Sequence, residues 1–259
     1  MPFAPVDGGQ LFYRLEGRAD LPVLVFSNSL GTNHTMWAPQ IAPFSQHFRV
    51  LRYDSRGHGA SSVPDGEYSL DQLGGDVLAL LDHLEIAAAS FCGLSVGGLT
   101  GQWLALYAPE RFEKVVLCNT AARIGTVDAW NERIALVRAD GVRAISQAIL
   151  ARWFTQGFHE QESDTVDRFR TILEGTAPEG YAGTSAAVRD CDLRDRISRV
   201  SLPVMVIAGL QDTATPPEGG RFLAQQIKGA VLVELDAAHL SNVELPQRFT
   251  EEVLQFLVS

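Results

Sequence analysis

A serine between glycines is the feature of this chain that most directly suggests chemistry. The segment 93–98, GLSVGG, follows a short apolar run that ends at Cys92, and a helical pattern comes after it. A G-x-S-x-G segment between a strand and a helix forms a sharp turn that exposes the serine hydroxyl at the edge of a sheet. Glycine is needed beside the serine because side chains there would collide with neighbouring backbone. Ser95 is therefore the candidate nucleophile, and an exposed serine in a glycine-rich turn is the alternative.

A serine hydroxyl needs a base, and the base needs a group that orients it. In this architecture the chain order is serine, then an acid, then histidine. Asp212 follows the apolar run 204–208, and His239 follows the apolar run 231–235. Both positions are carboxyl ends of expected strands, where such a sheet places its site. Asp236 is a rival acid, but it lies too close along the chain to His239, so the predicted triad is Ser95, Asp212 and His239.

Attack on an ester carbonyl places negative charge on the carbonyl oxygen. Two N–H donors would stabilise that charge, and losing one donor of this kind costs about 3 kcal/mol. The amide of Val96 directly follows the nucleophile and is the first candidate donor. The second is expected in the loop after the apolar run 23–26, at Leu30, where Gly31 permits a tight turn. His34 follows the same loop and is a further candidate for lining the pocket.

Unbroken apolar runs alternate with helical patterns along much of the chain. Runs of four to six apolar residues are typical of strands covered on both faces, as in a parallel sheet. The sequence predicts a hairpin at 3–6 and 11–13, strands at 23–26, 48–51, 90–92, 114–118, 204–208 and 231–235, and helices at 70–85, 99–107 and 246–257. This alternation favours an α/β fold with helices on both faces of the sheet.

The alternation stops over residues 122–196. This stretch is rich in helix formers and contains no run typical of a buried strand. The strand pattern returns at residue 204. The sequence thus predicts a helical insertion at 122–196 within an α/β core formed by 1–121 and 197–259.

The composition excludes several classes of protein. The 259 residues include 21 Lys and Arg against 31 Asp and Glu, which gives a net charge of −10 and argues against nucleic-acid binding. No apolar run approaches the roughly 18 residues that a membrane-spanning helix needs. The first residues do not resemble a signal peptide, so we expect a cytoplasmic protein. Cys92, Cys118 and Cys191 form neither a disulfide framework nor a zinc pattern, and no dinucleotide motif is present, so no metal and no cofactor are expected.

Several segments together carry a family resemblance. The chain resembles the α/β-hydrolases with a helical cap, whose fold has a mostly parallel eight-stranded sheet, in the segments 93–98 (GLSVGG), 54–61 (DSRGHGAS), 209–212 (GLQD) and 238–239 (AH). It is similar more narrowly to the 3-oxoadipate enol-lactonases of the β-ketoadipate pathway in 27–32 (SNSLGT), 36–37 (MW) and 53–59 (YDSRGHG). Many family members carry His-Gly in the first loop, and Asn28-Ser29 replaces it here, as in the lactonase subgroup. Within 54–61, Asp54, Arg56 and His58 are expected to form a structural turn in which Asp54 pairs with Arg56.

The resemblance implies hydrolysis of a small anionic enol-lactone through a serine acyl-enzyme, in the catabolism of aromatic compounds. Because the chain is acidic and such a substrate carries a carboxylate, a local cation is expected in the cap. Arg133 lies one helical turn after Trp130, so one face could present both to the pocket, although Arg133 could equally be a solvated surface residue. Trp153 and Ser29 complete the candidate substrate contacts, and both tryptophans could instead be cap core.

Other functions remain open from sequence alone, because fold and triad do not choose a substrate. A carbon–carbon bond hydrolase, a general carboxylesterase or a perhydrolase could use the same triad. A ligand receptor built on this fold is the non-enzymatic alternative, and the presence of all three triad residues argues against it.

Overall fold

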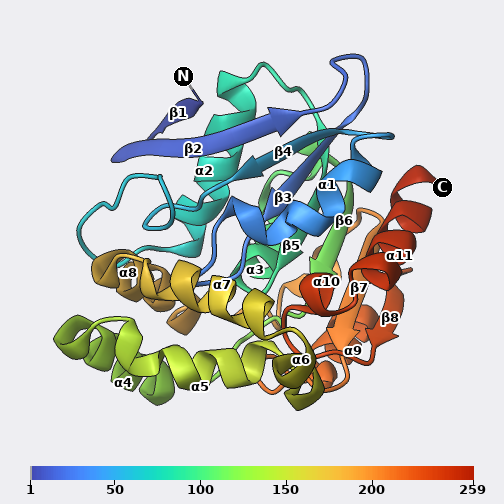
Figure 1. The fold of residues 1–259 in the computed structure, drawn as a ribbon. Coiled ribbons are helices and arrows are strands. Elements are labelled where there is room, and N and C mark those ends of the chain that lie inside the picture. Colours follow the sequence, from blue (N-terminus) through green and yellow to red (C-terminus); the bar gives the residue numbers. More distant parts are fainter. Residues whose placement is uncertain (1) are drawn as a thin grey trace.

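The computed structural model describes residues 2–259, so Met1 of the predicted core range lies outside the described residues. Its centre is an eight-stranded sheet in the order β1-β2-β4-β3-β5-β6-β7-β8 (Figure 1). The strands are β1 Phe3–Val6, β2 Gly9–Glu16, β3 Val23–Ser27, β4 Arg49–Tyr53, β5 Ala89–Leu94, β6 Phe112–Cys118, β7 Val204–Gly209 and β8 Val231–Leu235. The pairs β1–β2 and β2–β4 are antiparallel, and all other pairs are parallel. The predicted mostly parallel α/β sheet is confirmed.

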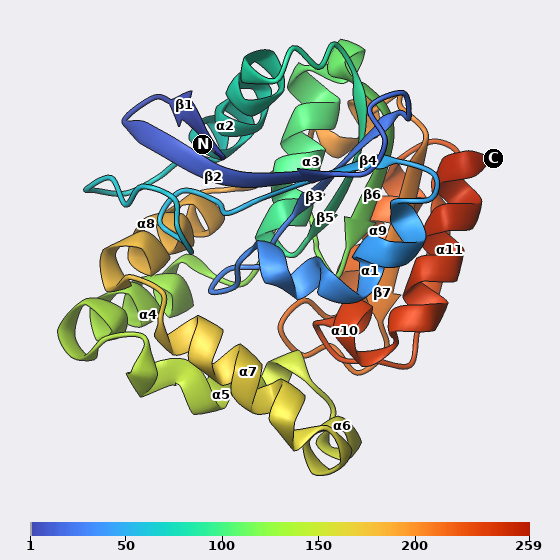
Figure 2. The same ribbon diagram turned by 45° about the horizontal axis from the view of Figure 1, so that its top comes forward.

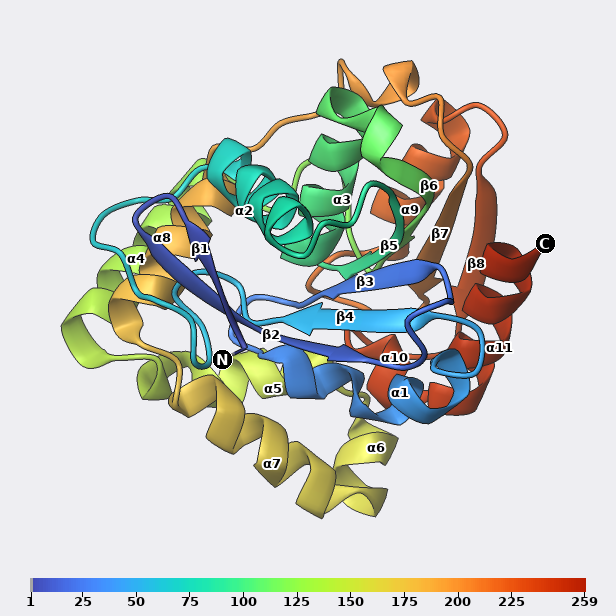
Figure 3. The same cartoon turned by 90° about the horizontal axis from the view of Figure 1, so that it is seen from above.

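Helices cover both faces of this sheet. Helices α2 (Leu70–His83), α3 (Val96–Tyr107) and α9 (Pro217–Gln226) lie on one face, and α1 (Ala38–Phe44) and α11 (Pro246–Val258) lie on the other (Figure 3). Every residue of β5 and of β7 is consequently buried. Because both faces of these strands are buried, their sequences are mostly unbroken runs of apolar residues.

Short helical segments complete the core. Helix α10 spans Ser241–Glu244, and 3-10 turns span His34–Trp37, Pro109–Arg111 and Ile197–Arg199. Across the described part of the chain, no helix is both long enough and apolar enough to span a membrane.

Five helices between β6 and β7 gather at one end of the sheet (Figure 2). They are α4 Val127–Asp140, α5 Arg143–Trp153, α6 Gln156–Gln161, α7 Ser163–Glu174 and α8 Pro178–Arg189. The two ends of this stretch meet, because the Leu193 amide donates to the Ala122 carbonyl at 2.9 Å. We propose that residues 122–196 form a cap inserted into a core of 1–121 and 197–259.

Several boundaries differ from the sequence prediction by a few residues, and two of these differences have a clear local reason. Helix α3 begins at Val96 rather than Leu99, because the helix starts directly after the sharp turn at Ser95. Strand β5 spans Ala89–Leu94 rather than 90–92, since it continues through Gly93, which an apolar-run criterion does not count.

Candidate active site

The candidate site lies where five neighbouring parallel strands end. The sheet order places β3, β5, β6, β7 and β8 side by side, so their carboxyl ends share one edge. The loops there carry, in the same order, Leu30, Ser95, Asn119, Asp212 and His239. Residues separated by more than 200 positions in sequence therefore meet because of strand order alone.

Ser95 stands on a strained turn between β5 and α3. Its φ of 60° and ψ of −114° lie in a region that non-glycine residues rarely adopt. A Cβ on Gly93 would lie 2.1 Å from the Gly97 carbonyl oxygen, and a Cβ on Gly97 would lie 2.4 Å from the Ser27 carbonyl oxygen. These distances explain why glycine flanks the serine. Among the described residues Ser95 Oγ has no hydrogen-bond partner, and Ser95 lines a pocket.

His239 and Asp212 form a buried pair beside Ser95. His239 Nδ1 lies 2.8 Å from Asp212 Oδ2, so Nδ1 carries the proton and Nε2 is left as the basic nitrogen. Nε2 lies 3.4 Å from Ser29 Oγ. Catalytic contacts are often long until substrate binds, so the absence of a Ser95–His239 hydrogen bond among the described residues is compatible with a catalytic pair.

Asp212 is held as a carboxylate by several donors. Its Oδ1 accepts hydrogen bonds from the amides of Ala214 at 2.8 Å and Thr215 at 2.9 Å. Its Oδ2 accepts from the Thr215 hydroxyl at 2.7 Å and from Asn119 Nδ2 at 3.1 Å. Burial raises the pKa of Asp212, but the electrostatic attraction of His239 and the hydrogen bonds from His239 and Thr215 outweigh it, so that the pKa lies below its ordinary value.

Sequence reasoning missed Asn119 and Thr215. Asn119 directly follows β6, so the strand-end rule that selected Asp212 and His239 could have found it. Thr215 had no such signal, because its contact depends on the turn that follows Asp212. The rival acid Asp236 is exposed and accepts from Gln211 Nε2 at 2.8 Å, away from the imidazole.

Leu30 and Val96 line the same pocket as Ser95, and within residues 2–259 their backbone amides have no acceptor. Val96 is the first residue of α3, where an amide has no partner within the helix. The amides of Ser29, Gly31 and Thr32 all donate hydrogen bonds, whereas Leu30 N–H has no acceptor among the described residues. Leu30 and Val96 thus offer the two donors that a developing oxyanion requires.

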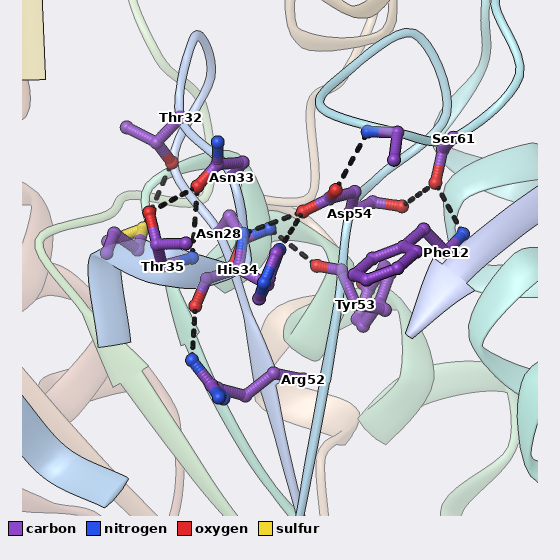
Figure 4. Close-up of polar contacts among 12 residues, drawn as sticks. Phe12, Asn28, Thr32, Asn33, His34, Thr35, Arg52, Tyr53, Asp54 and Ser61 are labelled. Atoms are coloured by element: carbon purple, nitrogen blue, oxygen red, sulfur yellow. Dashed lines mark hydrogen bonds and ion pairs between the residues drawn. The ribbon is translucent and has the colours of Figure 1, made fainter. Parts of the chain in front are cut away.

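The loop that carries Leu30 is fixed from behind. The Gly31 amide donates to His58 Nε2 at 3.0 Å, and His58 Nδ1 lies 3.1 Å from the Arg56 carbonyl oxygen. Burial lowers the pKa of His58, which favours this neutral ring. Asn28 adds a further tie, because its Nδ2 donates to the Tyr53 carbonyl at 2.7 Å (Figure 4).

Two expectations about the neighbouring loop were wrong. His34 does not line the pocket, because its Nδ1 and its amide lie 2.7 and 2.8 Å from Asp54 Oδ1 (Figure 4). Asp54 does not pair with Arg56 either. Arg56 forms a two-pronged ion pair with Asp76 on α2, at 2.6 and 2.5 Å. Because the Arg56 guanidinium is buried, it requires a carboxylate partner. The packing of α2 supplies Asp76, and residue spacing in the sequence does not reveal this contact.

A pocket of about 130 Å³ opens between the strand ends and the cap helices. Most of the predicted site residues line it, namely Ser29, Leu30, Ser95, Val96, Trp130, Arg133, Trp153 and His239. Asp212 sits behind His239. Trp130 and Trp153 are also buried in the cap. Each tryptophan therefore both belongs to the cap core and lines the pocket.

The cap supplies two arginines to this pocket. Arg123, Arg138 and Arg143 pair with Asp192, Glu179 and Glu174 respectively. By contrast, Arg133 and Arg152 line the pocket and form no ion pair within residues 2–259. Arg133 stacks its guanidinium 4.5 Å from the centroid of the Trp130 ring.

The positive charges of both pocket arginines affect the pKa of Tyr181, which lines the same pocket. Burial raises the pKa of its phenol, and the charges of Arg133 and Arg152 oppose that rise. The sequence did not predict Arg152 as a substrate contact, because no spacing distinguished it from the other arginines of the cap.

The fold and the site define a class of protein. Residues 22–246 match the family model described as alpha/beta hydrolase fold, and the chain belongs to that family. It is 51% identical to "3-oxoadipate enol-lactonase 2" of Acinetobacter baylyi, over 94% of this chain and 91% of that protein. It is 39% identical to "3-oxoadipate enol-lactonase 1" of the same organism, over 97% and 94%. A crystal structure of the enol-lactonase from Burkholderia xenovorans LB400 matches with a TM-score of 0.98 at 49% identity, over the full length of both chains.

Proposed function

We propose that this protein hydrolyses 3-oxoadipate enol-lactone to 3-oxoadipate through an acyl-enzyme on Ser95. The observation that supports this most strongly is the pairing of two features in one pocket. Ser95 and His239, which is paired with buried Asp212, line this pocket together with Arg133 and Arg152, two arginines that form no ion pair within residues 2–259. The similarity to enol-lactonases over nearly the whole chain supports the same substrate.

The first half of the reaction opens the ring. Ser95 Oγ attacks the lactone carbonyl carbon while His239 Nε2 takes the hydroxyl proton. The amides of Leu30 and Val96 stabilise the negative charge on the carbonyl oxygen. The bond between that carbon and the ring oxygen then breaks, and His239 returns its proton to the departing enolate oxygen. An enolate is a better leaving group than an alkoxide, so this protonation is undemanding.

The second half releases the product. The enol remains attached to the acyl chain, and its conversion to the ketone makes renewed ring closure unfavourable. His239 removes a proton from a water molecule, whose oxygen attacks the acyl carbon, and Ser95 regains its proton as the acyl bond breaks. The product carries a second carboxylate, and throughout the cycle Asp212 holds the imidazole and stabilises its charged form.

The cap is proposed to recognise the carboxylate that the substrate carries. Arg133 is suited to this because its guanidinium lies over the Trp130 ring and forms no ion pair within residues 2–259. A guanidinium binds a carboxylate through two parallel hydrogen bonds. Arg152 adds positive charge at the same opening.

The substrate preference is tested by comparing kcat/KM for 3-oxoadipate enol-lactone with kcat/KM for the neutral ester 4-nitrophenyl acetate. We expect the anionic lactone to be strongly preferred. A well-folded enzyme that favours the neutral ester would instead be a general carboxylesterase, and the lactonase proposal would be rejected.

A further inference from the structure

One carboxylate links the loop of the candidate base to the cap. Glu244 is the last residue of α10 and is half-buried. Its Oε2 accepts a hydrogen bond from the amide of Ala238 at 2.8 Å. Its Oε1 accepts from the amide of Thr155 at 3.1 Å and also from the Thr155 hydroxyl. The side chain therefore bridges the residue before His239 and the junction between α5 and α6.

A second hydrogen bond joins the same two segments. The amide of Leu240, the residue after His239, donates to the carbonyl of Trp153 at 3.0 Å. The backbone N–H groups of the residues before and after His239 are thus held by Glu244 and by the Trp153 carbonyl, and Glu244 is itself held by Thr155. The ring of Trp153 also lines the pocket. Trp153 therefore lines the pocket with its side chain and holds the loop of His239 through its backbone carbonyl.

We propose that Glu244 is a positioning residue that couples this cap junction to the imidazole of His239, an inference that rests on the proposed role of His239 as the base. Asp212 contacts the imidazole at Nδ1. A contact at Nδ1 does not by itself fix the direction of Nε2, which also depends on where the backbone of the loop lies. The Glu244 bridge and the Leu240–Trp153 hydrogen bond hold that backbone from the cap side, and Asn119 Nδ2, which donates to the Ala238 carbonyl at 3.1 Å, holds it from the sheet side.

A carboxylate is required for the bridge. All three of its partners are donors, and the two carboxylate oxygens supply only acceptors. In Glu244→Gln one of the two ends would present an N–H₂ group to a backbone amide, so the hydrogen bond to that amide would be lost. Misplacement of a catalytic group by about 1 Å can cost roughly 100-fold in rate.

The test compares Glu244→Gln with Glu251→Gln, a matched change at an exposed position of α11. We expect Glu244→Gln to lower kcat for the enol-lactone and for 4-nitrophenyl acetate by about tenfold or more with little change in KM, within the loss that misplacement can cause. The downfield proton resonance of His239 Nδ1–H, observed by NMR, should weaken in the same variant. Both readouts should be unchanged in Glu251→Gln.

A second pair of variants guards against a general folding defect. Thr155→Val removes one donor to Glu244 and should also lower kcat, whereas Thr155→Ser, which keeps the hydroxyl, should recover most of the rate. Folded Glu244→Gln enzyme with unchanged kcat and an unchanged resonance would overturn the positioning role. If Ser95→Ala itself kept full activity on both substrates, the proposed catalytic centre would fail, which is a different and separable result.

Discussion

At the scale of single residues, the Asp212–His239 pair carries the proposed chemistry. Replacing Asp212 with Asn keeps the shape but places an N–H₂ group or a neutral oxygen beside Nδ1, which favours the wrong tautomer. We expect kcat to fall by roughly 10⁴-fold, as for the equivalent change in serine hydrolases with this constellation. Steady-state kinetics on the lactone measures the loss.

The matched control is Asp236→Asn. Asp236 is exposed and contacts Gln211 rather than the imidazole, so this change should leave kcat near the wild-type value. A large loss in Asp236→Asn together with a small loss in Asp212→Asn would show that the acid has been assigned to the wrong residue.

Asp212 also links stability to pH. Its pKa in the folded protein lies below the ordinary value, because the attraction of His239 and the hydrogen bonds outweigh the effect of burial. A carboxyl group of this kind stabilises the fold above its unfolded pKa of about 3.9 and loses that contribution as the pH falls toward the folded pKa. Urea unfolding at several pH values should show a shallower acid loss in Asp212→Asn than in the wild type. Parallel curves would contradict this contribution.

The residues that sequence reasoning found are those that follow recognisable strands or motifs. Ser95, Asp212 and His239 each come directly after an apolar run, so their meeting follows from parallel strand order. Thr215 and Glu244 could not be found in this way. Their roles depend on which donors a turn or a short helix brings within 3 Å, and such distances have no signature in residue spacing.

At the scale of elements, helix α2 contains two adjacent glycines with opposite surroundings. A Cβ on Gly74 would lie 2.0 Å from Cε3 of the Trp103 ring, whereas a Cβ on Gly75 would have nothing within 4 Å. Gly75→Ala should therefore stabilise the protein by about 0.5–1 kcal/mol, because alanine loses less backbone entropy in a helix. Gly74→Ala should destabilise it by roughly 1–3 kcal/mol through overpacking.

Chemical unfolding of the two variants checks this opposition. Each serves as the control for the other, since the substitution and the helix are the same. Equal effects of both substitutions would mean that α2 does not pack on α3 through Gly74 as the structure shows.

The order and type of the core elements were predictable, but some contacts between elements were not. Alternating apolar runs and helical patterns indicated the parallel sheet, and the structure confirms it. The Arg56–Asp76 pair, by contrast, joins a loop to α2 and replaced the expected Asp54–Arg56 contact. An arginine can pair with a carboxylate nearby in sequence or with one that the packing of helices brings close, and only the folded structure shows which pair forms.

At the scale of the whole molecule, the charge is strongly acidic while the proposed substrate is an anion. The net charge is −10, yet Arg133 and Arg152 face the pocket without acidic partners within the described residues. Local charge at the pocket therefore has to overcome the repulsion of the whole molecule. The acidic composition and the arginines of the cap together indicate that a local cation is needed, but the sequence does not show which arginine supplies it.

Substitution of Arg133 tests this division of charge. Arg133→Gln should raise KM for the anionic lactone by about 10- to 100-fold, the equivalent of one or two charge-assisted hydrogen bonds, with little effect on 4-nitrophenyl acetate. Arg138→Gln, on the same helix but paired with Glu179, is the control and should leave KM unchanged. Equal changes for the anionic and neutral substrates would show that Arg133 does not recognise a carboxylate.

The central claim is that Ser95 opens an anionic enol-lactone. Its most direct test is the loss of the ultraviolet absorbance of 3-oxoadipate enol-lactone, followed with wild-type enzyme and with Ser95→Ala side by side. The account predicts rapid loss with the wild type and none above background with the variant, while both proteins unfold at similar temperatures. A folded wild-type protein that leaves the lactone intact, or a variant that still consumes it, would contradict the account.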